Sequence, residues 1–233
     1  MKSTVFITGI GRGLGKELFE HFISNGHTVY GLVRDESVAE KLRGQLPDKA
    51  RIVLADLSTD ESMKSIQKAV GQTPINLLIN NAGIGGKSHL IDNIESEEIL
   101  QLFQVHCLGV FRTAKALKTN LLQAADPIVL NLNSRLGSIT RQANGTYENI
   151  TVSYSYRVAK AAQNMLTNCL RSEFRNRIKF ISIHPGKMKT DIAQVDADTE
   201  PSVIAHRILE SYQSGTLEEK NGIVELEREI IEW

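Results

Sequence analysis

The sequence predicts an α/β fold in a single domain: a doubly wound, seven-stranded parallel sheet with helices on both faces. Three observations predict it. Short apolar runs alternate with segments of helical periodicity along the whole chain. The cores of these runs are apolar at nearly every position, as is typical of parallel strands that helices cover on both sides. The first run leads through a string of glycines directly into a helical segment.

The elements follow in order along residues 1–233. Strands are expected at Ser3–Thr8, Thr28–Val33, Arg51–Ala55, Ile75–Asn80, Pro127–Asn133, Ile178–His184 and Gly222–Leu226. Helices are expected at Leu14–Asn25, Ser37–Arg43, Asp60–Val70, Glu95–Ala124 (with a break near Gly109), Tyr154–Arg175 and Pro201–Tyr212. Two stretches have little pattern, and we expect a polar flap near 138–153 and a substrate lid near 187–200.

Composition and charge exclude several classes of protein. The 27 Lys and Arg residues balance 27 Asp and Glu residues, so the basic footprint of a nucleic-acid binder is absent. No apolar run approaches the ~18 residues of a membrane span, and the first residues do not resemble a secretory signal. The two cysteines lack metal-ligand spacing. We therefore expect a cytoplasmic protein with reduced cysteines, no metal site, and no nucleic-acid or membrane partner.

The glycine-rich turn indicates a dinucleotide site in a Rossmann fold. It reads Thr8-Gly9-Ile10-Gly11-Arg12-Gly13-Leu14-Gly15. Glycines there allow a tight turn, let the backbone approach a pyrophosphate and let the helix pack closely on the strand. The N–H groups of the following helix point at the phosphates. A glycine-rich string indicates a dinucleotide site only when it follows a strand and precedes a helix, as it does here.

Further motifs follow at the ends of later strands and on a helix. They are Asp56-Leu57, Asn80-Asn81-Ala82-Gly83, Tyr156-Arg157-Val158-Ala159-Lys160 and Pro185-Gly186 with Thr190 beyond it. Together with TGxxxGxG at the first turn, this series resembles the short-chain dehydrogenase/reductase superfamily over almost the whole chain. Within it the sequence is most similar to the sniffer and C-factor group of small carbonyl reductases. That finer likeness comes from Ser134-Arg135-Leu136-Gly137-Ser138-Ile139, from Tyr-Arg-x-x-Lys and from the final Trp233.

The glycine turn and the resemblance together imply a set of cofactor-binding residues. These are Thr8, Gly9, Gly11, Arg12, Gly13, Leu14, Gly15, Arg34, Asp56, Leu57, Asn81, Ala82, Gly83, Tyr156, Lys160, Pro185, Gly186, Met188 and Thr190.

Tyr156 and Lys160 are the candidate proton-transfer pair. Residues four apart share a helix face, so the ammonium would lie beside the phenol. A free tyrosine has a pKa of about 10 and needs help of roughly 4 kcal/mol to exchange a proton near neutral pH. A nearby ammonium and an oxidised nicotinamide both favour the phenolate. The resemblance implies that Tyr156 is the general acid in reduction and that Lys160 also binds the nicotinamide ribose.

Ser134 is the candidate donor to the substrate carbonyl. It stands directly after a strand, where ligands of parallel sheets bind, and its hydroxyl can donate to an oxygen that gains negative charge. Ser138 is the competitor. The S-x-x-G spacing to Gly137 favours Ser134. The interval from Ser134 to Tyr156 is 22 positions, longer than in most superfamily members, and this surplus is what predicts the flap.

His106 departs from the family pattern, which usually has Asn at this position, holding a water connected to the lysine. Histidine is bulkier and can titrate. Two interpretations stay open: His106 alters the catalytic relay, or it fills the Asn site while water rebuilds the relay. We count it among the catalytic residues together with Ser134, Tyr156 and Lys160.

Two cations indicate NADP(H) as the cofactor. Arg34 follows the second strand and Arg12 lies in the glycine turn, so both can meet a 2′-phosphate. If Asp35 instead reached the ribose, NAD would be preferred.

The sequence thus predicts an NADPH-dependent oxidoreductase that transfers a hydride to a ketone or aldehyde. The alternative is a cofactor-binding, non-catalytic signalling member of the same family. The expected partner is a small-molecule carbonyl substrate. The resemblance also implies a homo-oligomer, a dimer or tetramer, because the segments Glu95–Ala124 and Tyr154–Arg175 pair across an axis in relatives.

Overall fold

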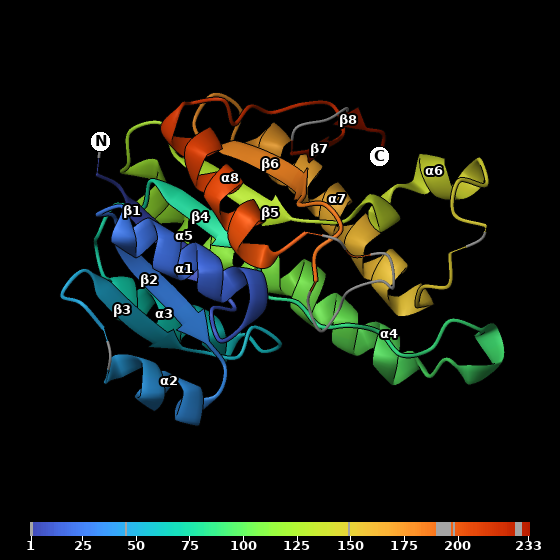
Figure 1. Ribbon diagram of the computed structural model, residues 1–233, viewed down its shortest axis with the longest axis horizontal. Helices are drawn as coiled ribbons and strands as arrows, with labels where there is room; N and C mark the ends of the chain where they lie inside the picture. The colour runs from blue at the N-terminus through green and yellow to red at the C-terminus, as the bar shows by residue number, and fades with distance from the viewer. Residues whose placement is uncertain (1, 45, 149, 190–196, 198, 227–229) are drawn as a thin grey trace.

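A computed structural model describes residues 2–44, 46–148, 150–189, 197, 199–226 and 230–233. Its sheet has the strand order β3-β2-β1-β4-β5-β6-β7-β8 (Figure 1). The strands are β1 (Thr4–Thr8), β2 (Thr28–Val33), β3 (Ala50–Leu54), β4 (Leu77–Asn80), β5 (Ile128–Leu132), β6 (Lys179–His184), β7 (Ile223–Glu225) and β8 (Ile230–Ile231). All pairs from β3 to β7 are parallel. This order changes direction between β1 and β4, which is the place where doubly wound sheets bind nucleotides.

The expected strand count of seven is wrong by one. β8 pairs antiparallel with β7, through Val224 and Ile230. A strand of two residues is too short to show an alternating pattern, so the sequence carries no signal for it. The seven predicted strands are all present and parallel.

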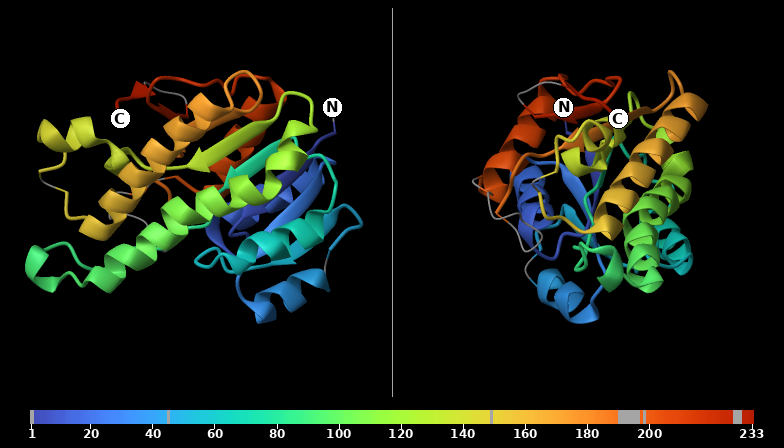
Figure 2. Two further views of the ribbon diagram at one scale, coloured as in Figure 1. Left: turned by 180° about the vertical axis from the view of Figure 1, so that it is seen from behind. Right: turned by 90° about the vertical axis from the view of Figure 1, so that its right-hand side faces the viewer.

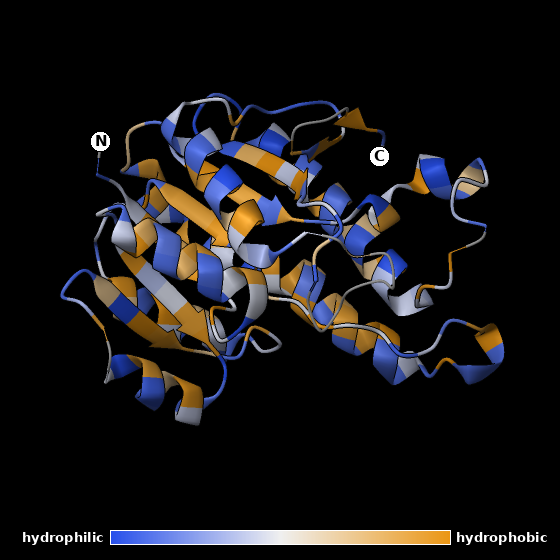
Figure 3. Cartoon of the chain, viewed as in Figure 1, coloured by the Kyte–Doolittle hydropathy of each residue, from blue (hydrophilic) through white to orange (hydrophobic). Residues whose placement is uncertain are grey.

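Two helical layers cover the sheet (Figures 1 and 2). On one face lie α1 (Gly13–Ser24), α2 (Glu36–Arg43) and α8 (Pro201–Gln213). On the other lie α3 (Glu61–Val70), α5 (Gly109–Leu122) and α7 (Tyr154–Glu173). Within β1, Val5 and Ile7 pack against the first layer, whereas Phe6 packs against the second. This alternation is the reason that apolar side chains occupy consecutive positions in the strands, as the colouring in Figure 3 shows.

The long predicted helix at Glu95–Ala124 is interrupted, as the sequence suggested, at Gly109. It consists of α4 (Ser96–Phe103), a π-helical turn η2 (Gln104–Leu108) and then α5. A π turn inserts one extra residue into a helix and rotates the side chains within it, and such turns are frequent at functional sites. This one carries His106.

The predicted polar flap contains more regular structure than expected. It holds the short helix α6 (Ile139–Ala143), and the 3₁₀ turn η3 (Arg135–Gly137) directly precedes it. Ser134 and Ser138 cap these two elements, because their hydroxyls accept from Leu136 N and Arg141 N. In Figures 1 and 2, α6 and the loop that carries η1 (Ile91–Asn93) extend beyond the end of the sheet.

Three further expectations concern the chain as a whole. Cys107 and Cys169 are both free thiols, as predicted. Within the described residues, no helix combines the length and the apolar character needed to cross a membrane. Positions 190–196 and 198 of the predicted lid, including the candidate Thr190, lie outside the described residues.

Candidate active site

The glycine turn forms a cradle with no room for side chains. A Cβ atom at Gly15 would lie 2.1 Å from the carbonyl oxygen of Gly9, so only glycine allows α1 to begin this close to β1. At the N-cap of α1, Arg12 makes no capping hydrogen bond with its own side chain. The first N–H groups of α1 are therefore left for another acceptor. A pyrophosphate is the ligand that such a backbone cradle fits.

Thr8 and Asn81 hold this cradle together. The hydroxyl of Thr8 accepts from Asn81 N and Ala82 N, both at 2.9 Å. The amide of Asn81 donates to the carbonyls of Thr8 and Gly9 at 3.0 and 3.1 Å. Both residues were predicted to bind the cofactor. The structure uses their side chains to join the ends of β1 and β4, so they shape the site rather than present free side chains to it.

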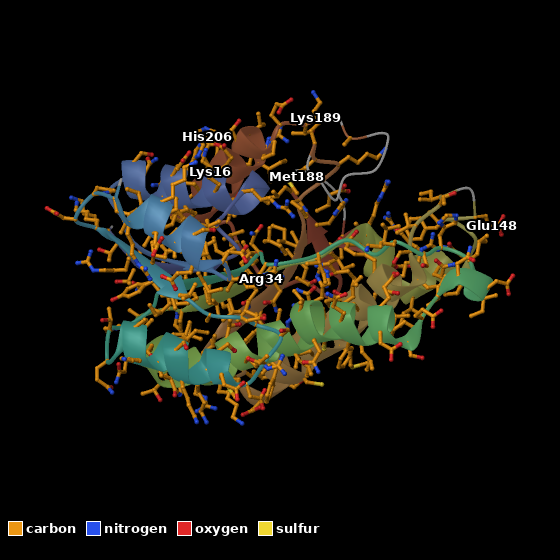
Figure 4. The ribbon with its side chains drawn as sticks, turned by 90° about the horizontal axis from the view of Figure 1, so that it is seen from below. Lys16, Arg34, Glu148, Met188, Lys189 and His206 are labelled. Carbon is orange, nitrogen blue, oxygen red and sulfur yellow. The ribbon has the colours of Figure 1, made fainter. Side chains whose placement is uncertain are left out.

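The other predicted cofactor residues lie at the carboxyl ends of adjacent strands. Arg34 follows β2, Asp56 and Leu57 follow β3, Gly83 follows β4, and Pro185, Gly186 and Met188 follow β6. Figure 4 shows Arg34 and Met188, which come from distant parts of the sequence, in the central part of the molecule seen from below. Together with β1 and β5, these strands form one continuous row in the sheet. The described residues thus fit an extended dinucleotide laid across the strand ends.

Arg34 lies at the surface directly after β2, beside Asp35. Its side chain is 60% exposed, and its Nε lies 3.7 Å from Asp35 Oδ1. Asp35 is itself the N-cap residue of α2. Asp35, which would favour NAD, therefore lies beside Arg34, which would favour NADP. A 2′-phosphate can compete with Asp35 for the exposed guanidinium of Arg34.

Ser134, Tyr156 and Lys160 come together at the end of β5. Lys160 Nζ lies 5.7 Å from the centroid of the Tyr156 ring, and the Ser134 side chain is close enough to the Tyr156 phenol to lower its pKa. The N-cap residue Ser153 accepts from Tyr156 N at 3.1 Å and fixes the first turn of α7. This arrangement joins a hydroxyl donor, a phenol and a cation at one point of the sheet edge.

Burial shifts the pKa values of Tyr156 and Lys160 in the directions that favour their neutral forms. Burial raises the pKa of Tyr156 to about 12, and the contact with Ser134 offsets only part of that shift. Burial lowers the pKa of Lys160 to about 7. The sequence predicted that the ammonium would lower the phenol pKa, but in the protein alone burial has the larger effect. A phenol with this pKa is protonated throughout the physiological range, as a proton donor must be.

Ser134 and Ser138 have different partners. Ser134 is 7% exposed, its Oγ accepts from Leu136 N at 3.2 Å, and its side chain lies close to the Tyr156 phenol. Ser138 Oγ accepts from Arg141 N at 3.1 Å, as the N-cap of α6. The structure therefore brings Ser134 to the phenol and gives Ser138 a role in the flap.

We expect Ser134→Ala to lower kcat about a hundred- to a thousandfold, the cost of one lost donor to a developing oxyanion. The matched Ser138→Ala should keep kcat close to wild type and lower only the stability of the flap, by about 1 kcal/mol. Steady-state kinetics and thermal unfolding of both variants measure this. The reverse order of effects on kcat would reassign the donor to Ser138.

His106 lies directly against Tyr156. The two rings meet edge to face with centroids 5.4 Å apart. His106 Nε2 lies 2.8 Å from the carbonyl oxygen of Ile84 and 3.3 Å from its amide nitrogen. Because the contact with the carbonyl is the shorter, we assign Nε2 as the protonated nitrogen. Nδ1 is then a buried acceptor, with no partner among the described residues. A Cβ at Gly83 would come within 2.7 Å of the His106 ring, so Gly83 makes the space for the bulkier residue.

Burial and the charge of Lys160 lower the pKa of His106 to about 3. Both causes favour the neutral form of the ring near neutral pH. We expect His106→Asn to keep or raise turnover, with the same pH dependence between pH 5 and 7 as the wild type. Paired pH–rate profiles under saturating NADPH test this. A large loss of turnover with unchanged folding and cofactor binding would show that the imidazole has a role which Asn cannot perform.

Several residues that shape the site were missed in the sequence. Asn133 donates to Asn164, and Asn164 in turn donates to the carbonyl of Gly137 at 3.1 Å. Glu98 accepts from Lys87 N and from Ser155 Oγ, and so ties the loop after β4 to the start of α7. Asn133 could have been identified from the sequence, because it is a polar residue at the end of the predicted apolar strand Pro127–Asn133. Glu98 has no such signal, because its partners are distant in the sequence.

Comparison with known proteins gives consistent matches. A family model described as short chain dehydrogenase matches residues 3–201. The chain is 28% identical over 197 residues to an NADPH-dependent 3-dehydrocapnine reductase of Ornithobacterium rhinotracheale, a match that covers 80% of this chain and 65% of that relative. The carbonyl reductase Sniffer of D. melanogaster superposes with a TM-score of 0.84, at 26% identity over the whole of both chains. A carbonyl reductase from Pseudomonas aeruginosa PAO1 in complex with NADP shares the fold, with a TM-score of 0.79 and 23% identity over the whole of both chains.

Proposed function

The chain belongs to the short-chain dehydrogenase family, and from this premise we propose that it is an NADPH-dependent reductase of a ketone or aldehyde, with Tyr156 as the proton donor. One observation carries the proposal: the ammonium of Lys160 lies against the buried Tyr156 ring at the end of the sheet that also holds the glycine cradle, and Ser134 is close enough to lower the pKa of that phenol. The NADPH-dependent relative and the NADP-bound neighbour add support for the cofactor.

Each side chain has a defined task in this reaction. Bound NADPH supplies the hydride. Ser134 donates a hydrogen bond to the carbonyl oxygen as negative charge develops on it. Tyr156 gives its proton to the same oxygen, which completes the alcohol. The ammonium of Lys160 stabilises the phenolate that Tyr156 becomes.

Arg34, with Arg12 nearby in the glycine turn, is proposed to select the cofactor by contacting the 2′-phosphate. A guanidinium suits this task because it binds phosphate through two parallel hydrogen bonds. The exposed position of Arg34 at the end of β2 supports this assignment.

The substrate is proposed to bind between the flap and the loop after β4. Glu98 ties that loop to α7, and a Cβ at Gly86 would overlap Ser153, so the loop lies directly against the first turn of α7. A homo-oligomer is proposed as well. It is supported by the large apolar side chains that α4, α5 and α7 expose, namely Leu100, Phe111, Val158 and Met165.

The test is consumption of NADPH with a panel of aldehydes, ketones and diketones. The proposal expects turnover with at least one carbonyl, and alcohol formed in equal amount to the cofactor oxidised. Tight binding of NADPH without turnover of any carbonyl would favour the non-catalytic alternative. The convergence of three catalytic side chains on one point weighs against that alternative.

A further inference from the structure

The ammonium of Lys160 is held by two neutral oxygens. Nζ donates to the carbonyl of Leu132 at 2.8 Å and to Gln163 Oε1 at 3.0 Å. The Gln163 amide nitrogen lies 3.4 Å from the same carbonyl and donates to it. Lys160 and Gln163 are 5% and 2% exposed. The lysine, the glutamine and the end of β5 therefore form a closed buried triangle.

The hydrogen-bond acceptors of the Lys160 ammonium do not include a carboxylate among the described residues. Among the described residues, no acidic side chain bonds Lys160, and burial alone accounts for the lowering of its pKa to about 7. The titratable groups around this region are Tyr156 on α7, His106 on the π turn, His184 at the end of β6 and Glu225 of β7, which lies beside His184. Three further cations act on His184 together with Lys160, namely Arg135 of η3, Arg141 of α6 and Lys187 after β6. The charge of Lys160 contributes to lowering the pKa of both histidines, but neither histidine is its hydrogen-bond partner.

We propose that Gln163 is a positioning residue for the reaction: its amide oxygen fixes the ammonium of Lys160 beneath the Tyr156 ring without adding a negative charge. The geometry assigns this task because Gln163 lies one helical turn beyond Lys160 and on the same face of α7. The inference rests on the proposed function, in which the ammonium stabilises the tyrosinate.

The proposal fixes the sign of the pH dependence. Reduction uses the ammonium form of Lys160, so turnover falls as pH rises through the pKa of that residue. Gln163→Glu places a carboxylate at the same point and should move this alkaline limb upward by about one to three pH units. Gln163→Met leaves Nζ with only the Leu132 carbonyl, so the limb should move to lower pH. Opposite movements in two variants of one position are not expected from a purely structural role.

The experiment pairs pH–rate profiles with a titration that needs no turnover. The ¹³C signal of the Lys160 Cε carbon, assigned by its loss in Lys160→Met, is followed against pH in the full chain. The control is Asn168→Asp, about 12 Å further along α7, where an added charge should leave both measurements unchanged. The proposal is supported if the pKa of Lys160 and the alkaline limb of the pH–rate profile both move to higher pH in Gln163→Glu and to lower pH in Gln163→Met.

An unchanged Lys160 titration in both Gln163 variants overturns the inference. If Gln163→Glu does not fold, Gln163→Met alone decides, because its titration must still move to lower pH. A protein that shows these titration shifts but reduces no carbonyl retains the positioning contact and refutes the proposed function instead. The two failures are thus distinguishable.

Discussion

Tyr156→Phe is expected to lower turnover about a hundred- to ten-thousandfold, the contribution of a general acid, while NADPH binding stays close to wild type. The substitution removes only the phenol oxygen and keeps the ring against His106. Ser134 keeps its contact with Leu136 N, so the end of β5 should stay in place. Steady-state kinetics give kcat, and titration of cofactor fluorescence gives the affinity.

Tyr154→Phe is the matched control for this variant. Tyr154 lies on the same first turn of α7 but is 47% exposed, so its loss of a hydroxyl should leave kcat unchanged. If Tyr156→Phe retained most of the wild-type kcat, Tyr156 would not be the proton donor, and the assignment of the whole site would fail with it.

The second large effect is expected at Arg34. Arg34→Ala should weaken NADPH binding about ten- to a hundredfold and change NADH binding little, because a charge-assisted contact with the 2′-phosphate is worth roughly 1.5–3 kcal/mol. Dissociation constants for both cofactors measure this difference. Arg43→Ala removes another exposed charge, from α2, where Arg43 pairs with Glu36 at 2.9 Å, and should leave both affinities unaltered. Equal losses of NADPH and NADH in Arg34→Ala would move the discriminating role to another residue, with Arg12 first.

Most of the fold could be predicted because the strands are buried on both faces. Val5, Phe6 and Ile7 are each fully buried, in two different layers, and such continuous apolar runs are easily found in a sequence. The catalytic groups could be predicted for a similar local reason. Tyr156 and Lys160 share one helix face, so their spacing of four residues already implies their proximity. Ser134 directly follows a strand, where ligands of parallel sheets bind.

What could not be predicted depends on contacts between distant segments. The ring of His106 reaches Tyr156 because the π turn and the space at Gly83 place it there. The Glu98 contacts join a loop, α4 and α7. The spacing of three residues places Gln163 beside Lys160, but only the folded structure shows that both side chains are buried and share the Leu132 carbonyl. The balance of burial against charge that sets the pKa of Tyr156 likewise requires the folded structure.

The central claim is that this site transfers a hydride from NADPH to a carbonyl carbon. The most direct measurement uses NADPH that carries deuterium at the transferable position, incubated with the wild-type protein and a panel of carbonyl compounds. We expect an alcohol with deuterium on its carbinol carbon, in equal amount to the oxidised cofactor, and almost none with Tyr156→Phe. NADPH that binds in the site but delivers no deuterium to any carbonyl of the panel would contradict it.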